Sequence, residues 1–194
     1  MLTGNEIKKR LGTDIIISPF DESQLNPNSY NIKLHNELLV YDRPQKVFHN
    51  YKNDYTYDPK NDYTIGIREP LDMKKDNPTT KIIIPEEGYE LKPGKLYLGR
   101  TVEYTETYNL IPCIDGRSST ARLGINVHST GGFGDIGFKG TWTLEISVIE
   151  PVIIYPWIQI GQLYYYEITG NSDMQYNGRY QGQIDAVSSR MYKG

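Results

Sequence analysis

The sequence has a single cysteine, three histidines and no long apolar run. Cys113 has no second cysteine to pair with, so an internal disulfide is excluded. With so few sulfur and imidazole ligands, a structural or catalytic zinc site is not expected. No apolar run approaches the roughly 20 residues that span a bilayer, and the N-terminus lacks the apolar core of a signal peptide. We therefore expect a cytoplasmic protein that does not enter a membrane.

The chain also lacks a strong charge of either sign. Its 21 Lys and Arg residues stand against 24 Asp and Glu residues, which gives a formal net charge of -3. The protein as a whole therefore has no positive electrostatic field that would hold a nucleic-acid backbone, and any site for a polyanion must be local. We expect one domain over residues 1–194, because a chain of this size buries roughly 70% of its unfolded surface in a single core.

Most of the chain consists of short β-branched or aromatic runs separated by Pro, Gly, Asn and Asp. Such a pattern favours a closed or two-sheet β structure. Strands are expected at 15–18, 29–34, 37–41, 81–84, 95–104, 141–148, 152–155 and 159–169. A helix is expected at 3–11, because Thr3 and Glu6 form a capping-box pattern and Gly12 would end it. The polar segment 50–76 is expected to be a surface excursion.

Tyrosine is abundant, with 17 residues. Most tyrosines lie at strand-like positions beside apolar residues, as at 164–166, where packing is the simplest interpretation. Tyr176 and Tyr180 differ, because they lie in a polar, glycine-containing tail that has no core pattern of its own. They could close over a ligand.

The run 116–145 has the highest concentration of polar residues that could be functional, and it reads GRSSTARLGINVHSTGGFGDIGFKGTWTLE. Ser118 or Ser119 would cap a short helix that stops at Gly124. A helix start with hydroxyl groups and the Arg117 guanidinium beside it would suit a phosphate group. A capped helix with a surface arginine has the same pattern, so this motif alone does not decide between the two.

The loop 129–140 contains five glycines, which allow the backbone to approach a flat ligand closely. Asp135 lies in its middle, either as a turn residue or as a functional carboxylate. In the next strand, alternation predicts that Thr143 and Glu145 share a polar face and that Trp142 lies on the opposite, apolar face. Glu145 would then either face solvent or line a cleft, where its pKa would be raised for general acid/base work.

Taken together, these motifs resemble dCTP deaminase, the deaminating branch of the dUTP pyrophosphatase superfamily. The resemblance is carried by GRSSTARLG at 116–124, His128-Ser129-Thr130, the D-x-G-x-x-G spacing from Asp135, and T-L-E ending at Glu145. Two flanking segments agree, NPNSYNIKL at 26–34 and RYQGQIDAVSSR at 179–190. The second resembles the closing segment of the family, which implies that 171–194 covers the site.

The resemblance implies a distorted β-barrel or jelly-roll-like subunit of the dUTP pyrophosphatase type, with a short N-terminal helix and one short internal helix. It implies a homotrimer with active sites between subunits. The implied reaction is hydrolytic deamination of dCTP to dUTP and ammonia without zinc, with Mg2+ carried by the triphosphate and dTTP as a candidate inhibitor. The chain indeed lacks the His/Cys plus Cys-x-x-Cys signature of zinc deaminases.

Residue by residue, Glu145 matches the catalytic glutamate of the family. That carboxylate takes a proton from the water that attacks C4 of cytosine and delivers protons to N3 and the leaving amine. Arg122 matches the arginine near the base and the catalytic water. The other matches are to substrate-binding positions: Arg117, Ser118 and Ser119 for the phosphates, Thr130 and Gly131 for the pyrimidine, and Tyr176, Arg179 and Gln183 for closure over the triphosphate.

The residues before Asp135 depart from several monofunctional deaminases. Those enzymes have Ala-His-Arg-Ile where this chain has Gly-Gly-Phe-Gly at 131–134. A glycine followed by an aromatic residue looks closer to bifunctional enzymes, which also cleave dUTP to dUMP and pyrophosphate and whose loop aspartate positions the hydrolytic water. Asp135 is the candidate for that second activity. Gly134 replaces the aliphatic residue usual at its position, so the second activity stays open.

Two other interpretations fit less well. A plain dUTP pyrophosphatase is disfavoured by the glutamate of T-L-E and by a C-terminus that reads VSSRMYKG instead of a glycine-rich tail. A non-catalytic β module of the same fold is disfavoured because the chain contains together Arg117, Ser118, Arg122, Asp135 and Glu145.

Overall fold

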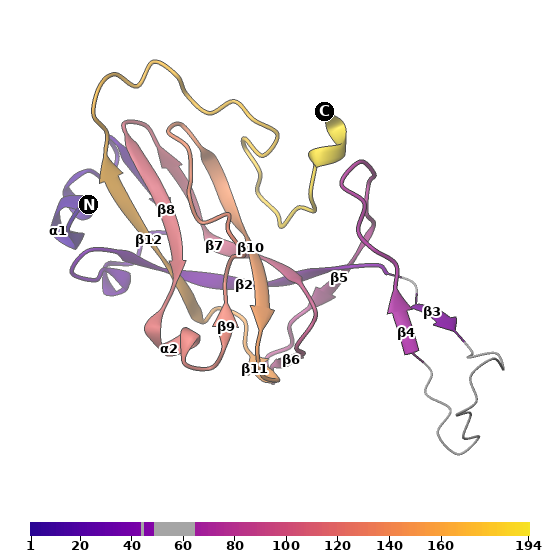
Figure 1. Ribbon diagram of the computed structural model, residues 1–194. Coiled ribbons are helices and arrows are strands. Elements are labelled where there is room, and N and C mark those ends of the chain that lie inside the picture. Colours follow the sequence, from indigo (N-terminus) through magenta and orange to yellow (C-terminus); the bar gives the residue numbers. More distant parts are fainter. Residues whose placement is uncertain (44, 49–64) are drawn as a thin grey trace.

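A computed structural model describes residues 1–43, 45–48 and 65–194. This described part is mainly β (Figure 1), with two short α-helices, α1 (Gly4–Lys9) and α2 (Ser118–Ala121), and two 3-10 helices at Glu22–Gln24 and Met191–Lys193. The strands of the described residues are β1 (Ile15–Ser18), β2 (Tyr30–Tyr41), β3 (Gln45–Phe48), β4 (Ile65–Arg68), β5 (Thr79–Ile83), β6 (Tyr89–Leu91), β7 (Tyr97–Thr107), β8 (Leu110–Gly116), β9 (Ile125–Asn126), β10 (Lys139–Val148), β11 (Val152–Ile154) and β12 (Gln159–Glu167). Of the expected surface excursion, residues 50–64 lie outside the described residues.

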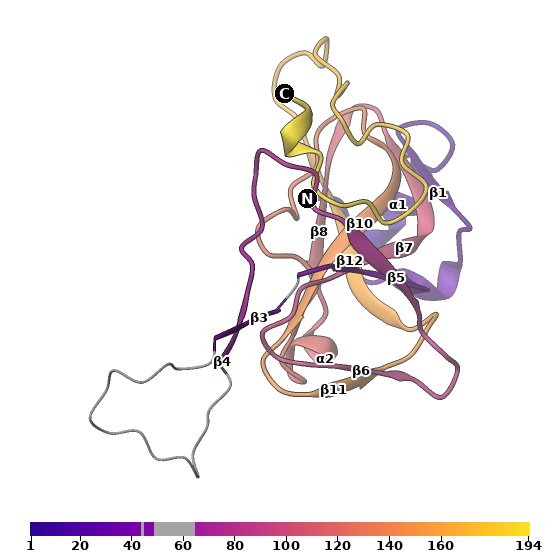
Figure 2. The same cartoon turned by 90° about the vertical axis from the view of Figure 1, so that its right-hand side faces the viewer.

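Eight strands form one nearly closed, barrel-like sheet in the order β8-β12-β2-β7-β10-β9, with β1 added to β7 and β5 added to β2. Figures 1 and 2 show this sheet from two sides. The remaining strands form two separate antiparallel pairs, β6 with β11 and β3 with β4. The distorted barrel with a short N-terminal helix and a short internal helix confirms the fold expected from the sequence.

Local signals at the N-terminus behave as expected. The Thr3 hydroxyl accepts a hydrogen bond from the Glu6 N–H at 3.3 Å and caps α1. Gly12 adopts a positive φ of 80° just after the helix, which only glycine adopts at low cost. The two predicted strands at 29–34 and 37–41 are a single strand, β2, whose pairing with β7 shifts register between Leu34 and Leu38.

The internal helix begins differently from the prediction. Its N-cap is Arg117, and neither Ser118 nor Ser119 has that role. The Thr120 hydroxyl accepts from the Arg117 N–H at 3.2 Å and donates to the Arg117 carbonyl at 2.9 Å, so it binds the residue that precedes the helix. Gly124 has a φ of 73° and ends the turn, as predicted.

The polar and apolar faces of β10 position the candidate site. Leu144 and Ile146 are fully buried in the core, whereas Thr143 and Glu145 are half-buried on the other face. Alternation along a strand explains this arrangement, because successive side chains point to opposite faces. The expectation for this part of the strand is therefore confirmed.

The C-terminal segment 171–194 runs across one end of the barrel and returns beside β10 (Figure 1). The Thr141 N–H donates to the Gln183 carbonyl at 2.9 Å, and Gly182 N–H donates to the Lys139 carbonyl at 2.8 Å. Gly140 permits this approach, because a Cβ at that position would lie 2.6 Å from the Gln183 carbonyl oxygen. No helix within the described residues is long and apolar enough to span a membrane.

Candidate functional site

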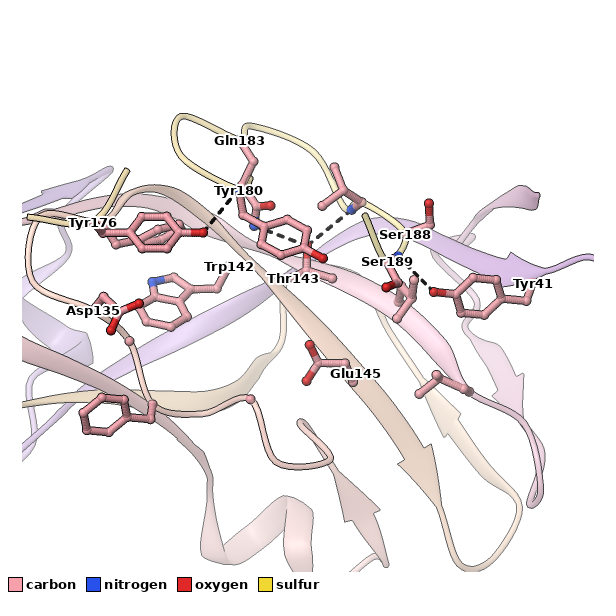
Figure 3. A pocket seen from close by; sticks show the side chains of 17 residues that line it. Tyr41, Asp135, Trp142, Thr143, Glu145, Tyr176, Tyr180, Gln183, Ser188 and Ser189 are labelled. Atoms are coloured by element: carbon pink, nitrogen blue, oxygen red, sulfur yellow. Dashed lines mark hydrogen bonds between the residues drawn. The ribbon is translucent and has the colours of Figure 1, made fainter. Parts of the chain in front are cut away.

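A cavity of about 400 Å³ lies between the polar face of β10, the glycine-rich loop and the C-terminal segment (Figure 3). Glu145 stands near its middle, with Asp135 and Trp142 toward one end and Tyr41 and Ser189 toward the other. Its walls bring together residues from β2, β7, β10, the loop and the C-terminal segment. A concave site with a few convergent polar groups is the usual form of a small-molecule site.

Glu145 is a carboxylate in a partly desolvated position. Burial raises its pKa above the ordinary value, while a backbone hydrogen bond from Ser129 and the charge of His128 act in the opposite direction. Gly131 lies directly against it, since a Cβ at Gly131 would be 3.3 Å from Glu145 Oε2. Of the two expectations for this residue, the cleft-lining one is therefore confirmed, and the carboxylate has the environment of a general acid/base.

The loop that carries Asp135 is fixed by its glycines. The Ile114 N–H donates to the Gly132 carbonyl at 2.7 Å, and the Gly134 N–H donates to the Pro112 carbonyl at 2.9 Å, so the loop is seated on β8. A Cβ at Gly134 would lie 2.4 Å from Cη2 of Trp142, a distance that real atoms do not tolerate. This contact explains the missing aliphatic residue before Asp135, because the indole occupies its space.

Trp142 is buried in the core with Leu144 and Ile146, as strand alternation predicts, and its ring also borders the cavity. The pairing of β10 with β7 shifts register between Thr141 and Thr143, at this residue. The indole Nε1–H donates to Thr105 Oγ1 at 2.9 Å, and its ring centroid lies 5.0 Å from that of Phe138. The aromatic end of the cavity is consequently rigid.

The C-terminal segment supplies one wall. The Gln183 amide Nε2 donates to the Thr141 carbonyl at 2.7 Å and to Thr143 Oγ1 at 3.3 Å. Tyr176 and Tyr180 both line the cavity, and the Tyr180 N–H donates to the Tyr176 hydroxyl at 3.3 Å. The segment therefore covers the cavity, as the sequence led us to expect of these residues.

Sequence reasoning missed several lining residues, among them Tyr41, Ser188 and Ser189. The Ser189 N–H donates to the Tyr41 hydroxyl at 3.1 Å across a separation of 148 residues. No local pattern signals such a pair. Only the return of the chain beside β2 brings them together.

A second group of predicted site residues does not line this cavity: Arg117, Ser118, Ser119, Arg122, Thr130 and Arg179. The guanidinium of Arg117 donates to the Gln159 carbonyl at 3.0 Å, and that of Arg122 donates to the Ser118 carbonyl at 3.0 Å. Arg179 donates from Nε to the Gly194 carbonyl at 3.1 Å. Within one chain, the fold thus brings Glu145 and Asp135 to one cavity and leaves the arginines and serines around α2 outside it.

No group of three or more His, Cys, Asp and Glu side chains that could hold a metal ion occurs in the part of the chain that the structure describes. The Mg2+ of the expected substrate would enter with the triphosphate, and its role stays a prediction.

The fold is one that this chain shares with a solved deaminase. The crystal structure of 2'-deoxycytidine 5'-triphosphate deaminase from Agrobacterium tumefaciens matches with a TM-score of 0.54 at 18% identity, covering 84% of this chain and 45% of that chain. The chain belongs to the dCTP deaminase-like family, which it matches over residues 1–168.

Relatives with curated names agree over the full length. The "dCTP deaminase, dUMP-forming" of Clostridium acetobutylicum is 50% identical over 193 residues, which is 100% of this chain and 97% of that protein. The protein of the same name from Hathewaya histolytica is 49% identical over 193 residues, again 100% of this chain and 98% of that protein. The resemblance found in the sequence motifs is confirmed.

Proposed function

We propose that this protein converts dCTP to dUMP in two hydrolytic steps. Water first replaces the amine at C4 of cytosine, giving dUTP and ammonia, and a second water then cleaves dUTP to dUMP and pyrophosphate. The observation that carries the proposal is the position of two carboxylates, Glu145 and Asp135, on the walls of one cavity. The name of the relatives, dUMP-forming, describes the product of both steps together.

Glu145 is the proposed proton carrier of the first step. It takes a proton from the attacking water and passes protons to N3 and to the departing amine, so it must both accept and donate within one turnover. The raised pKa supports this role, because an acid/base group works best when its pKa approaches the operating pH. Gly131 has no Cβ, which would lie 3.3 Å from Oε2, so the space beside the carboxylate stays open for a flat ring.

Asp135 is the proposed group for the second step. It is exposed at the aromatic end of the cavity, on a loop that two backbone hydrogen bonds fix to β8. A carboxylate held there can orient a water toward the phosphate that will be cleaved. Mg2+ bound to the triphosphate would offset the negative charge of the phosphates when substrate is present.

The residues around α2 are proposed to serve a neighbouring subunit of a homotrimer. Arg117, Ser118, Ser119 and Arg122 would bind the phosphates and the base of a nucleotide held in the next subunit's cavity. The surface beside α2 supports a subunit contact, because Leu123 is 57% exposed and Ile149 is 69% exposed. A neighbouring subunit would remove these two apolar side chains from water.

Two assays on purified protein with dCTP and Mg2+ test the reaction. We expect ammonia and pyrophosphate to be released in equal amounts. Glu145→Gln is expected to abolish ammonia release, and Asp135→Asn is expected to abolish pyrophosphate release while ammonia is still formed. Ammonia release that survives in Glu145→Gln would refute the proton carrier. Ammonia without pyrophosphate from the parent protein would identify a deaminase that stops at dUTP.

Subunit mixing tests where the arginines act. Glu145→Gln and Arg122→Gln are each expected to be inactive as homotrimers. When the two variants are co-expressed, a cavity with an intact Glu145 can meet an intact Arg122 from its neighbour, which random assembly provides at about one site in four. We expect about a quarter of the parent activity. If both residues acted within one chain, mixing would restore no activity.

A further inference from the structure

We propose that Gln162 is a positioning residue, which fixes the turn that carries Arg117, Ser118 and Ser119 in the arrangement that binds the phosphates of the nucleotide. The inference rests on the phosphate-binding role proposed for these three residues. It also gives a role to the segment 26–34, which belongs to the sequence resemblance but does not line the cavity. The side chain of Gln162 joins this segment to the turn.

Strand β12 holds the turn through two hydrogen bonds. The Gln162 Nε2 donates to the Gly116 carbonyl at 2.9 Å, and the Arg117 guanidinium donates to the Gln159 carbonyl at 3.0 Å. The first bond fixes the backbone just before the arginine, and the second fixes the guanidinium itself. The direction in which this arginine points therefore depends on β12.

The same two glutamines are bonded to the start of β2. Gln162 Oε1 accepts from the Ser29 hydroxyl at 2.9 Å, and Ser29 Oγ accepts from Asn26 Nδ2 at 3.2 Å. Asn26 Nδ2 also donates to Asn31 Oδ1 at 2.8 Å, and Asn31 Nδ2 donates to Gln159 Oε1 at 3.0 Å. A continuous chain of hydrogen bonds thus leads from β2 through β12 to the turn.

The direction of these hydrogen bonds is fixed from one end. A backbone carbonyl can only accept, so the Gly116 oxygen requires the NH2 group of the Gln162 amide. The amide oxygen then requires the hydrogen of the Ser29 hydroxyl, and the Ser29 oxygen is left to accept from Asn26. Ser29 and Asn31 are 3% and 5% exposed, so water does not readily replace a lost partner. Removing one member is therefore felt by the others.

An irregularity in β12 allows both glutamines to take part. Gln159 and Gln162 are three residues apart, so a regular strand would point their side chains to opposite faces. The pairing of β12 with β2 shifts register between Gln159 and Gly161, which interrupts the alternation. Gly161 also lets β12 lie close to the end of β8, since a Cβ there would be 2.8 Å from the Asp115 carbonyl oxygen. The turn that follows β8 is thereby within reach of Gln162.

The test compares the parent protein with two variants that break the chain at different points. Gln162→Met keeps the length of the side chain and removes the amide, whereas Ser29→Ala keeps Gln162 and removes the donor to its oxygen. Inorganic triphosphate with Mg2+ is the probe, and its affinity for the folded protein is measured by calorimetry. We expect the Kd to rise about tenfold in Gln162→Met and about threefold in Ser29→Ala. The double variant is expected to bind no more weakly than Gln162→Met, because both residues act through one contact.

The reaction with dCTP gives a second readout. Lost phosphate binding raises KM, so we expect KM for ammonia release to rise about tenfold in Gln162→Met while kcat stays within about twofold of the parent. Tyr164→Phe is the matched control, because it removes a hydroxyl from the same strand that is hydrogen-bonded to Cys113 instead of the turn. Its KM and its triphosphate affinity are expected to equal those of the parent.

Two results would overturn the inference. One is parent-like triphosphate affinity in folded Gln162→Met, and the other is a fall of kcat in that variant at unchanged KM. Should the parent release no ammonia, the proposed reaction falls, and the triphosphate affinities still decide whether Gln162 acts on the turn.

Discussion

Replacing Gly134 by alanine is expected to separate the two proposed reactions. The added methyl group would lie 2.4 Å from Cη2 of Trp142, 2.8 Å from the Pro112 carbonyl oxygen and 3.0 Å from Cγ of Pro112. Neither neighbour yields easily, because the indole is hydrogen-bonded to Thr105 and is 7% exposed. The loop must therefore move away from β8.

The expected loss of stability follows from the kind of contact that the methyl group makes. Forcing one extra methyl group into a packed site costs about 1–3 kcal/mol. For a chain of this length, such a cost lowers the melting temperature by roughly 2–12 °C. The displacement carries Asp135, whereas Glu145 lies on β10 and keeps its place. Because a misplacement of about 1 Å can slow a reaction about 100-fold, we expect pyrophosphate release to fall by about 10- to 100-fold and ammonia release to change little.

Both products are measured from the same dCTP reaction, and unfolding is followed by calorimetry. Gly116→Ala is the control for stability, since a Cβ there would meet nothing closer than 3.9 Å. Its melting temperature is expected to stay near that of the parent. If Gly134→Ala melted like the parent and released both products at the parent rates, the packing argument for this loop would be refuted.

Two further predictions concern the C-terminal segment and the Glu145 carboxyl. Gln183→Leu removes the hydrogen bonds to the Thr141 carbonyl and to Thr143 Oγ1. We therefore expect faster tryptic cleavage within 171–194 and a KM for dCTP raised about tenfold, with kcat less affected. An unchanged KM and an unchanged cleavage rate would contradict the covering role of the segment. Burial raises the pKa of Glu145 above 4.5, so its contribution to stability decreases as the pH rises from 4.5 through that raised pKa. In Glu145→Gln the side chain at this position is neutral at every pH. We expect this variant to melt at or above the melting temperature of the parent at pH 7 and to lose any advantage below pH 4.5. A lower melting temperature at pH 7 would count against a desolvated carboxylate.

Much of the fold was predictable because its signals are local. The Thr3 cap, the positive φ at Gly12 and the buried and half-buried alternation from Thr143 to Val148 each depend on a few neighbouring residues. The start of α2 was not predictable, because Ser118 and Ser119 are good N-cap residue types, whereas the helix begins after Arg117 and Thr120 binds the Arg117 backbone. The alternation placed Trp142 with the buried residues of β10, but it did not show that the ring also borders the cavity.

The sequence by itself determined the family, the mainly β fold and the identity of the two carboxylates, because each follows from motifs of adjacent residues. Only the tertiary structure decided that Glu145 and Asp135 share a cavity, that Tyr41 meets Ser189 there, and that the residues around α2 lie outside it. It also decided why position 134 is glycine, since the indole that fills that space comes from another strand. Strand pairing and side-chain packing set these relations, and they join residues far apart in the chain.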